Sequence, residues 1–228
     1  MSHPLVIAHR GASAAYPENT VEAFHGARDA GADWVELDAR RTADGALVVH
    51  HDAVLGDGRT IVDLAADELP AHVPTLAEAL DACVGMGVNI EIKNNAPDPD
   101  FDPTEIVAAG VVELLVERGG RDSVLISSFN PATLLHLRNA APHLDTALLV
   151  VEPPSDVVEQ LVTAGHEALH PYDWWVTPEL VDACHAAGLR VNVWTVDDPN
   201  RMQELLDLGV DGLCTNVPDV ARRLIPRA

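Results

Sequence analysis

The stretch from Arg190 to Thr215 reads RVNVWTVDDPNRMQELLDLGVDGLCT and contains one complete strand–helix–strand unit. Its two apolar runs, Arg190–Trp194 and Gly212–Thr215, predict short buried strands. Between them, Asp198-Pro199 places a capping side chain before a proline at the first helical position. An apolar stripe at helical spacing and a terminal glycine complete the helix (Met202, Leu205, Leu206 and Gly209). This order predicts two parallel strands that are joined by a helical crossover.

The same alternation recurs along the whole chain. Further apolar runs predict strands at Val6–His9, Trp34–Ala39, Val88–Ile92, Val124–Ser127, Thr146–Val151 and Ala168–His170, with an extra short strand at Leu47–His50. Helix starts are marked by a capping residue before proline at Asp102-Pro103, Asn130-Pro131 and Thr177-Pro178, and by the capping-box pair Thr75 and Glu78. Gly31 and Gly188 lie where helices are expected to end.

Eight strands that alternate with helices predict a parallel sheet. Eight such units in 228 residues favour a closed (β/α)8 TIM barrel that forms one domain over residues 1–228. The alternative is an open, doubly wound sheet. The glycine-rich and phosphate-loop motifs that would support an open sheet do not occur in the sequence.

Composition and charge limit what the chain binds. Hydrophobic residues make up 47% of the chain, but no run approaches the ~18 apolar residues that a membrane-spanning helix needs. With 36 acidic and 14 basic residues, the net charge of −22 disfavours binding to nucleic acid. A small anionic substrate could still bind where a cation and a few basic side chains reverse the local potential.

The start of the chain and its cysteines indicate where the protein is expected to work. Residues 1–4 lack the basic and apolar regions of a signal peptide, and a strand pattern begins at Leu5. The three cysteines (Cys83, Cys184 and Cys214) are widely spaced, which argues against a disulfide framework or a zinc site. We therefore expect a reduced, cytoplasmic protein, and no pattern in the sequence indicates an oligomeric state.

Polar side chains gather near the carboxyl ends of the predicted strands, where the active sites of such barrels form. Glu36 and Asp38 are two residues apart in one strand, so both side chains face the same way. Glu91 and Lys93 repeat this spacing in the next barrel strand. If these faces point into the barrel, three carboxylates meet at one mouth, and burying them without a partner is costly. The cluster therefore predicts a bound divalent cation, and oxygen-only ligands favour Mg²⁺ or Ca²⁺.

Two histidines end the strands that flank the carboxylate pair. Because imidazole titrates near neutral pH, His9 and His51 together predict a general acid and a general base. His50 is the alternative to His51, since alternation along a strand lets only one of the two face inward. Arg10 and Lys93 would supply the positive charge that a phosphate group needs.

Short motifs occur in a fixed order along the chain. In chain order they are His9-Arg10-Gly11-Ala12, Pro17-Glu18-Asn19-Thr20, Glu36-Leu37-Asp38, His51-Asp52, Pro74-Thr75-Leu76-x-Glu78, Glu91-Ile92-Lys93, Ser127-Ser128-Phe129, Val193-Trp194-Thr195-Val196 and Thr215-Asn216-x-Pro218-Asp219. Each motif is weak alone. Their order and spacing from about residue 5 to residue 220 resemble the signatures of glycerophosphodiester phosphodiesterases.

The resemblance implies a (β/α)8 barrel in which Glu36, Asp38 and Glu91 hold one divalent cation, Mg²⁺ or Ca²⁺. It also implies that His9 and His51 are the acid–base pair. The resemblance therefore selects His51 over His50.

The resemblance further implies a pocket for the substrate. Arg10 and Lys93 would contact the phosphate. Asn19 would also lie in the site, although a helix N-cap is an equally good interpretation of this residue. Trp194 would form a wall against the glycerol or the leaving alcohol, with packing in the core as the alternative.

One departure from the family concerns an insertion after the second strand. Family members usually carry a small subdomain between the His-Asp motif and the Pro-Thr-Leu motif, but here Asp52 and Pro74 are only 22 residues apart. The expected fold is therefore a TIM barrel with a much shortened insertion. The shortened insertion bears on which alcohol the enzyme releases more than on how the phosphodiester bond is cleaved.

The implied reaction is the metal-dependent hydrolysis of a small-molecule glycerophosphodiester to glycerol 3-phosphate and an alcohol. The attacking oxygen is either that of water or the substrate's own 2-hydroxyl, which would give a cyclic phosphate that water then opens. One alternative is a lyase that acts on phospholipids and releases a cyclic phosphate as its product. A second makes Lys93 a Schiff-base nucleophile, and a third is a non-catalytic binding module.

Overall fold

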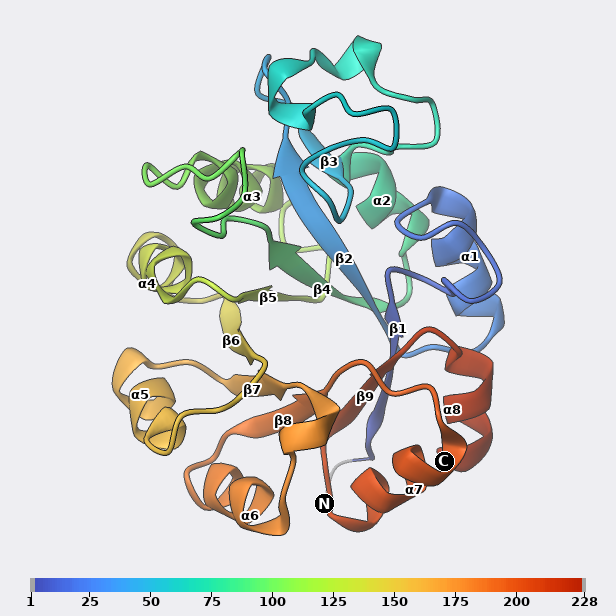
Figure 1. Cartoon of the computed structure of the whole chain (residues 1–228), viewed down its shortest axis with the longest axis vertical. Helices are drawn as coiled ribbons and strands as arrows, with labels where there is room; N and C mark the ends of the chain where they lie inside the picture. Colours follow the sequence, from blue (N-terminus) through green and yellow to red (C-terminus); the bar gives the residue numbers. More distant parts are fainter. Residues whose placement is uncertain (1–2, 227–228) are drawn as a thin grey trace.

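In a computed structural model, which describes residues 3–226, the chain forms a closed barrel of parallel strands surrounded by helices (Figure 1). The barrel strands are β1 (Leu5–His9), β2 (Trp34–Arg41), β4 (Gly87–Ile92), β5 (Val124–Ser128), β6 (Asp145–Val150), β7 (Ala168–Pro171), β8 (Arg190–Val193) and β9 (Gly212–Thr215). They pair in the order β1-β9-β8-β7-β6-β5-β4-β2, and pairing of β1 with β2 closes the sheet. The predicted TIM barrel is therefore confirmed, and the open sheet is wrong.

Helices cover the outside of the barrel (Figure 1). Within residues 3–226 the α-helices are α1 (Val21–Asp29), α2 (Leu76–Ala82), α3 (Ile106–Glu117), α4 (Pro131–Ala140), α5 (Val157–Ala164), α6 (Pro178–Ala186), α7 (Pro199–Asp207) and α8 (Pro218–Leu224). The caps predicted at Asn130, Thr177 and Asp198 are confirmed, because each side chain accepts a hydrogen bond from the first turn of its helix. Every helix in this part of the chain is too short or too polar to span a bilayer.

The helix start predicted at Asp102-Pro103 is wrong, because α3 begins only at Ile106. Asp102 forms a turn instead, in which its Oδ1 accepts a hydrogen bond from the Thr104 N–H at 2.9 Å. Glu105 follows in the left-handed backbone region and is buried, where its carboxylate accepts a hydrogen bond from Thr133 Oγ1 at 2.7 Å. This buried contact holds the loop after β4 against α4.

The main core lies between the barrel and its helices. Phe24 of α1, Leu80 of α2, Leu134 of α4 and Leu161 of α5 are fully buried there against the outer faces of the strands. Inward-facing side chains near the carboxyl ends of the strands are polar and leave room for a site, as expected for this fold.

The segment between β3 (Leu47–Val49) and α2 is the short insertion expected after the second strand. It continues from β3, which pairs antiparallel with β2, and contains two 3-10 helices, η1 (Ile61–Asp63) and η2 (Ala66–Glu68). Val48, Leu55 and Ile61 form a small core of their own. The segment projects from one edge of the barrel, at the top of Figure 1. A third 3-10 helix, η3 (Asp173–Trp175), follows β7.

Candidate active site

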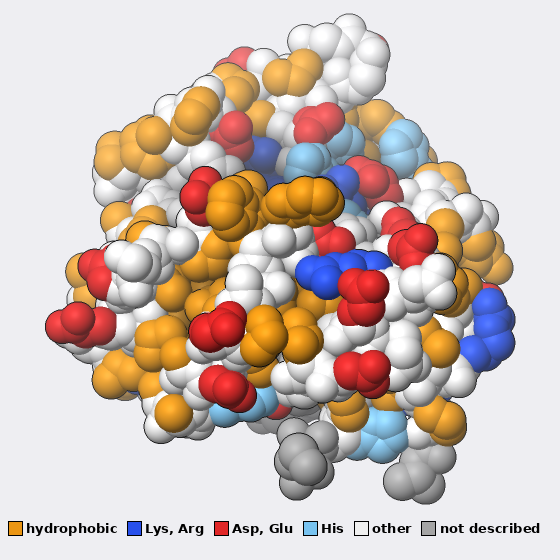
Figure 2. All heavy atoms as spheres, turned by 60° about the horizontal axis from the view of Figure 1, so that its bottom comes forward, with side chains coloured by type: hydrophobic (Ala, Val, Ile, Leu, Met, Phe, Trp, Pro, Cys, Tyr) orange, Lys and Arg blue, Asp and Glu red, His pale blue; other side chains and the backbone are white. Residues whose placement is uncertain are grey.

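A cavity of about 240 Å³ opens at the carboxyl ends of the barrel strands. Seven of the nine residues predicted for the site line it (His9, Arg10, Glu36, His51, Glu91, Lys93 and Trp194). The other two, Asn19 and Asp38, are buried against them, and Asn19 Nδ2 donates a hydrogen bond to Asp38 Oδ2 at 2.7 Å. Asn19 is not a helix N-cap, since Thr20 caps α1. Figure 2 shows Lys and Arg side chains beside histidines and carboxylates in a hollow bordered by hydrophobic side chains.

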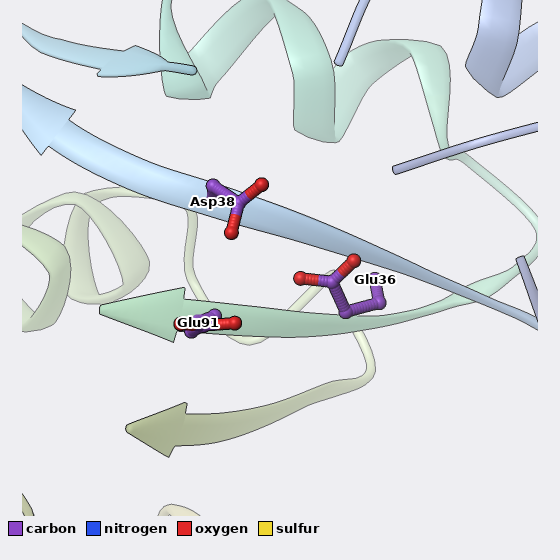
Figure 3. Close-up of side chains that lie close together, drawn as sticks. All are labelled: Glu36, Asp38 and Glu91. Carbon is purple, nitrogen blue, oxygen red and sulfur yellow. The ribbon is translucent and has the colours of Figure 1, made fainter. Parts of the chain in front are cut away.

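Three carboxylates lie close together at this cavity, two of them in its lining and Asp38 buried behind them (Figure 3). Glu36 and Asp38 lie on β2, and Glu91 lies on β4 in register with Asp38. One oxygen of each side chain lies within 4.8 Å of those of the other two, and all three residues are buried. The alternation predicted from the sequence therefore brings the three proposed cation ligands together.

Two basic side chains lie directly against the carboxylates. Lys93 Nζ is 3.0 Å from Asp38 Oδ1 and 2.5 Å from Glu91 Oε1. Arg10 Nε is 3.3 Å from Asp38 Oδ2. The carboxylates therefore do have partners, contrary to what the sequence prediction of a cation assumed, because these ion pairs offset part of the negative charge. Glu36 differs, since among the described residues its carboxylate has no ion pair with a lysine or arginine, and its nearest basic side chain is His9 at 4.0 Å.

Burial and neighbouring charges shift the pKa values of the three carboxyl groups in different directions. Burial, followed by repulsion from Asp38, raises the pKa of Glu36 to about 8. Burial also raises the pKa of Glu91 to about 7, although attraction to Lys93 opposes it. Asp38 is buried too, but the charges of Lys93 and Arg10 outweigh this effect and lower its pKa to about 2. Without a bound cation, Asp38 is therefore ionised at neutral pH while Glu36 retains its proton.

These shifts predict that the cation-free protein loses stability as the pH rises. A folded carboxyl group with a raised pKa holds a proton that the unfolded chain has released. The contribution of Glu36 and Glu91 to the free energy of unfolding is therefore fully present below about pH 4.5 and is lost as the pH rises through about 7 and 8. Urea unfolding in chelator measures this loss, and Glu36→Gln should make it smaller. An identical pH dependence in the wild type and the variant would contradict the raised pKa of Glu36.

His9 ends β1 and is oriented by an amide. Its Nδ1 donates a hydrogen bond to Asn216 Oδ1 at 2.7 Å, and Asn216 Nδ2 in turn donates to Asp197 Oδ2 at 2.7 Å. With the proton on Nδ1, the Nε2 lone pair of His9 faces Glu36 Oε2, which is 4.0 Å away. Burial and the charge of Arg10 lower the pKa of His9, so the ring is neutral near pH 7.

His51 lies at the base of the insertion and is held through both its ring and its backbone. Nδ1 donates to Asp52 Oδ1 at 2.7 Å, while Nε2 has no hydrogen-bond partner within residues 3–226. The His51 carbonyl accepts hydrogen bonds from Arg40 Nε and Nη2 at 2.9 and 2.6 Å. Arg40 is buried and also contacts both carboxylate oxygens of Asp100. Burial lowers the pKa of His51. His50 does not line the cavity, so the fold places His51 there.

Trp194 follows β8 and forms an aromatic wall of the cavity. Its ring centroid lies 5.4 Å from those of Phe129 and Tyr172, and Phe129 lines the cavity with it. Trp194 Nε1 donates a hydrogen bond to the His170 carbonyl at 2.7 Å, which fixes the indole. Trp194 therefore faces the cavity and is not a simple core residue.

Several side chains around the site are not apparent from the sequence. They are Arg40, Asp100 and Asp197, which hold other residues in place, and Asn89, His170 and Asn192, which line the cavity. Strand alternation could have predicted Asn192. This residue precedes Trp194 by two positions, so its side chain is expected to point to the same side of the sheet. The contacts of Arg40 and Asp197 join distant segments and have no local signal.

The same residues fall within a known family. The profile of the glycerophosphoryl diester phosphodiesterase family matches residues 9–220, a range that includes all the site residues described above. The chain belongs to this family. It is therefore a phosphoric diester hydrolase, and membership in the family supports the hydrolysis of glycerophosphodiesters as its reaction.

Relatives of this phosphodiesterase match it along nearly the whole chain. A glycerophosphodiester phosphodiesterase of Caldanaerobacter subterraneus is 34% identical over 250 residues, covering 97% of each chain. A solved phosphodiesterase of Oleispira antarctica, in complex with the product sn-glycerol-3-phosphate, has a TM-score of 0.91 at 30% identity and covers 99% of this chain and 98% of that one. A glycerophosphodiester phosphodiesterase of Thermotoga maritima has a TM-score of 0.83 at 28% identity, with 98% and 100% covered.

Lys93 does not have the environment of a Schiff-base nucleophile. Burial would lower the pKa of Lys93, but attraction to Asp38 and Glu91 outweighs it and raises this pKa. A lysine nucleophile requires the opposite shift. Together with membership in a hydrolase family, this shift makes the Schiff-base alternative wrong. Membership likewise favours an enzyme over a non-catalytic binding module.

Proposed function

We propose that this phosphodiesterase hydrolyses glycerophosphodiesters to glycerol 3-phosphate and an alcohol with the help of a divalent cation and two histidines. The observation that carries the proposal is that three buried carboxylates and two histidines lie together at one cavity, with the Nδ1 atom of each histidine engaged in a hydrogen bond. Carboxylates and imidazoles in this arrangement offer cation ligands and proton carriers at the same place.

The carboxylate cluster fits a hard divalent cation. Glu36, Asp38 and Glu91 offer only oxygen ligands, and Glu36 Oε1 is buried without a hydrogen-bond donor from the described residues. Such ligands favour Mg²⁺ or Ca²⁺ over Zn²⁺. The bound cation would supply positive charge where the phosphate develops negative charge in the transition state. Asn19 would contribute indirectly, because its amide holds the Asp38 carboxylate.

Arg10 and Lys93 would bind the phosphate group. Both line the cavity, and their side chains are only 17% and 6% exposed, so solvent screens them little. Once all three carboxylates are ionised, they outweigh these two basic groups by one negative charge, and a bound divalent cation would reverse this sign. The cavity would then attract a phosphodiester anion although the whole chain carries a net charge of −22.

His9 and His51 would carry the protons of the reaction. Each ring donates from Nδ1, so each can accept a proton at Nε2. One ring would accept the proton of the attacking oxygen, and the other, in its protonated form, would donate to the leaving alcohol. The attacking oxygen is that of water or the 2-hydroxyl of the substrate. Trp194 and Phe129 would border the leaving alcohol at the aromatic wall.

Asn216→Ala should lower kcat by on the order of 10-fold to 100-fold, because His9 loses the acceptor that keeps its proton on Nδ1 and its ring in place. The pH profile of kcat should shift as well, since the environment of the His9 ring changes. Steady-state kinetics from about pH 5.5 to about pH 9 would measure both effects. The exposed Asn200 provides a matched control, and Asn200→Ala should retain wild-type kinetics. A variant at Asn216 with unchanged kcat and pH profile would show that this amide does not position His9.

The proposed function is tested by assaying several glycerophosphodiesters after removal of metals with a chelator. Release of glycerol 3-phosphate from glycerophosphocholine, glycerophosphoethanolamine or glycerophosphoglycerol should return when Mg²⁺ or Ca²⁺ is added. Phosphorus NMR of the products distinguishes the hydrolase from the lyase, because only the lyase accumulates a cyclic phosphate. Full activity in the presence of chelator, or no turnover of any of these substrates, would contradict the proposal.

A further inference from the structure

The loop that follows β4 is closed at its base by a buried asparagine. Asn94 comes directly after Lys93, and its side chain bonds to both backbone groups of Asp102, donating to the carbonyl at 3.0 Å and accepting from the N–H at 2.8 Å. Asn94 Nδ2 also donates to Glu105 at 3.0 Å, which ties the base of the loop to the segment before α3. We call residues 94–102 the β4 loop. Its base is therefore fixed next to a side chain that is proposed to bind the phosphate.

Arg40 of β2 connects this loop to His51. Its Nη1 donates to both carboxylate oxygens of Asp100 at 2.8 and 2.6 Å, and its Nη2 donates to Asp98 Oδ2 at 3.2 Å. Its Nε and Nη2 donate to the His51 carbonyl at 2.9 and 2.6 Å. A guanidinium has five N–H donors, and these hydrogen bonds use all of them. Arg40 is therefore fixed in an arrangement that joins the β4 loop to the backbone of His51.

These contacts are shielded from solvent. The side chains of Arg40 and Asp100 are 3% and 4% exposed, and that of Asp98 is 28% exposed. Removing one member of such a group leaves a buried charge without its partner, so the group forms or breaks as a unit. Lysine cannot replace Arg40, because its three donors lie on one nitrogen and lack the planar fork that reaches both sides. None of these three side chains lines the cavity, so they do not act by touching the substrate.

We propose that the β4 loop positions His51 for proton transfer and that Arg40 transmits its effect. This inference rests on the proposed function, which gives His51 its role in proton transfer. β3 ends at Val49, so no strand pairing holds the His51 backbone, and within residues 3–226 only Arg40 donates a hydrogen bond to its carbonyl. A misplacement of about 1 Å at a reacting group can cost about 100-fold in rate. A single loop thus fixes both the base of Lys93 and the position of His51.

Substitutions in this group should change kcat more than KM. Arg40→Lys and Asp100→Asn should each lower kcat for glycerophosphocholine by about tenfold and change KM by less than about twofold, because the residues that contact the substrate remain. Arg118→Lys is the matched control. The Arg118 side chain is 5% exposed and bonds to both oxygens of Asp122 and to one oxygen of Asp81, but it lies at the C-terminal end of α3 and does not line the cavity. This control should keep wild-type kinetics even if it lowers stability.

A double substitution distinguishes positioning of His51 from a general loss of stability. In a His51→Ala background, Arg40→Lys should lower kcat by less than about twofold, because the ring that it positions is gone. A tenfold loss that persists in this background would contradict action through His51. Asp98→Asn changes the most exposed carboxylate of the group and serves if the buried substitutions unfold the protein. Its loss of kcat should likewise disappear in the His51→Ala background.

NMR of the imidazole rings tests the positioning without turnover. Arg40→Lys should shift the Cε1–H signal of His51 and leave that of His9 in place, whereas Arg118→Lys should move neither signal. An unchanged His51 signal in the Arg40 variant, or unchanged kcat in both the Arg40 and the Asp100 variants, would overturn the proposal. A His51→Ala enzyme with normal turnover would contradict the proposed function, and a displaced His51 signal in the Arg40 variant would still support the positioning role.

Discussion

His9→Ala and His51→Ala should each lower kcat for glycerophosphocholine by about 100-fold or more. Both rings line the cavity, and both use Nδ1 for a hydrogen bond to a neighbour, so Nε2 is the atom that can exchange protons. Alanine has no titratable group, and one of the two proton transfers then has to pass through water. The pKa values of both imidazoles are lowered by burial, which keeps the rings neutral and able to accept a proton at pH 7.

The control for this pair is the neighbouring histidine. His50 does not line the cavity, and its Nδ1 donates to the Asp52 carbonyl at 2.8 Å. His50→Ala should therefore keep near wild-type kcat, while thermal unfolding checks that all three variants retain the fold. Near-normal turnover in the His9 or the His51 variant would remove that residue from the proposed mechanism. A large loss in the His50 variant would contradict the assignment of His51.

The choice between His50 and His51 shows where strand alternation no longer predicts the orientation of a side chain. Alternation applies within a strand, but β3 ends at Val49, before either histidine. The orientation of His51 is set instead by Arg40, whose partner Asp100 lies 60 residues further along the chain. A contact of this kind leaves no local pattern in the sequence. The family resemblance was needed to select His51, and the fold supplies the physical reason.

The carboxylates were predictable because they lie inside regular strands. A spacing of two residues on β2 places Glu36 and Asp38 on one face, and the parallel register with β4 adds Glu91. Lys93 shares this face, but its place between two carboxylates was not predictable, because it depends on the distance between strands. The sequence suggested that Lys93 contacts a phosphate, and the fold shows that it also forms ion pairs with Asp38 and Glu91.

Local capping signals predicted most of the helices for a similar reason. Asn130 and Thr177 cap their helices because the side-chain oxygen of each stays available to the first turn. The tertiary contact of Asn130 uses Nδ2 instead, which donates to the Asn94 carbonyl at 2.8 Å. Asp102 carries the same signal, yet its side chain closes a turn and buried Glu105 anchors the loop. A buried contact with Thr133 therefore overrides the local preference and delays the helix.

Removal of divalent cations should abolish turnover, and Glu36→Ala should raise the Mg²⁺ or Ca²⁺ concentration needed for half-maximal activity by about 100-fold or more. A cation that binds Glu36 does not have to compete with a lysine or arginine, because Glu36 forms no ion pair with either among the described residues, whereas Asp38 and Glu91 do. Its pKa is raised to about 8 by burial and by Asp38, so a cation must displace a proton from this carboxyl group at neutral pH. Cation affinity should therefore increase between about pH 6 and about pH 8.

The dependence on pH separates a bound cation from simple charge screening. A cation that displaces protons releases them into solution, and calorimetry in buffers of different ionisation enthalpy counts them. The exposed Glu113 on α3 offers a matched control, because Glu113→Ala removes the same charge far from the cluster and should leave the cation requirement unchanged. Equal cation requirements in the Glu36 and Glu113 variants would mean that the carboxylate cluster does not hold the cation. The cluster would then be balanced by Lys93, Arg10 and the proton that Glu36 retains.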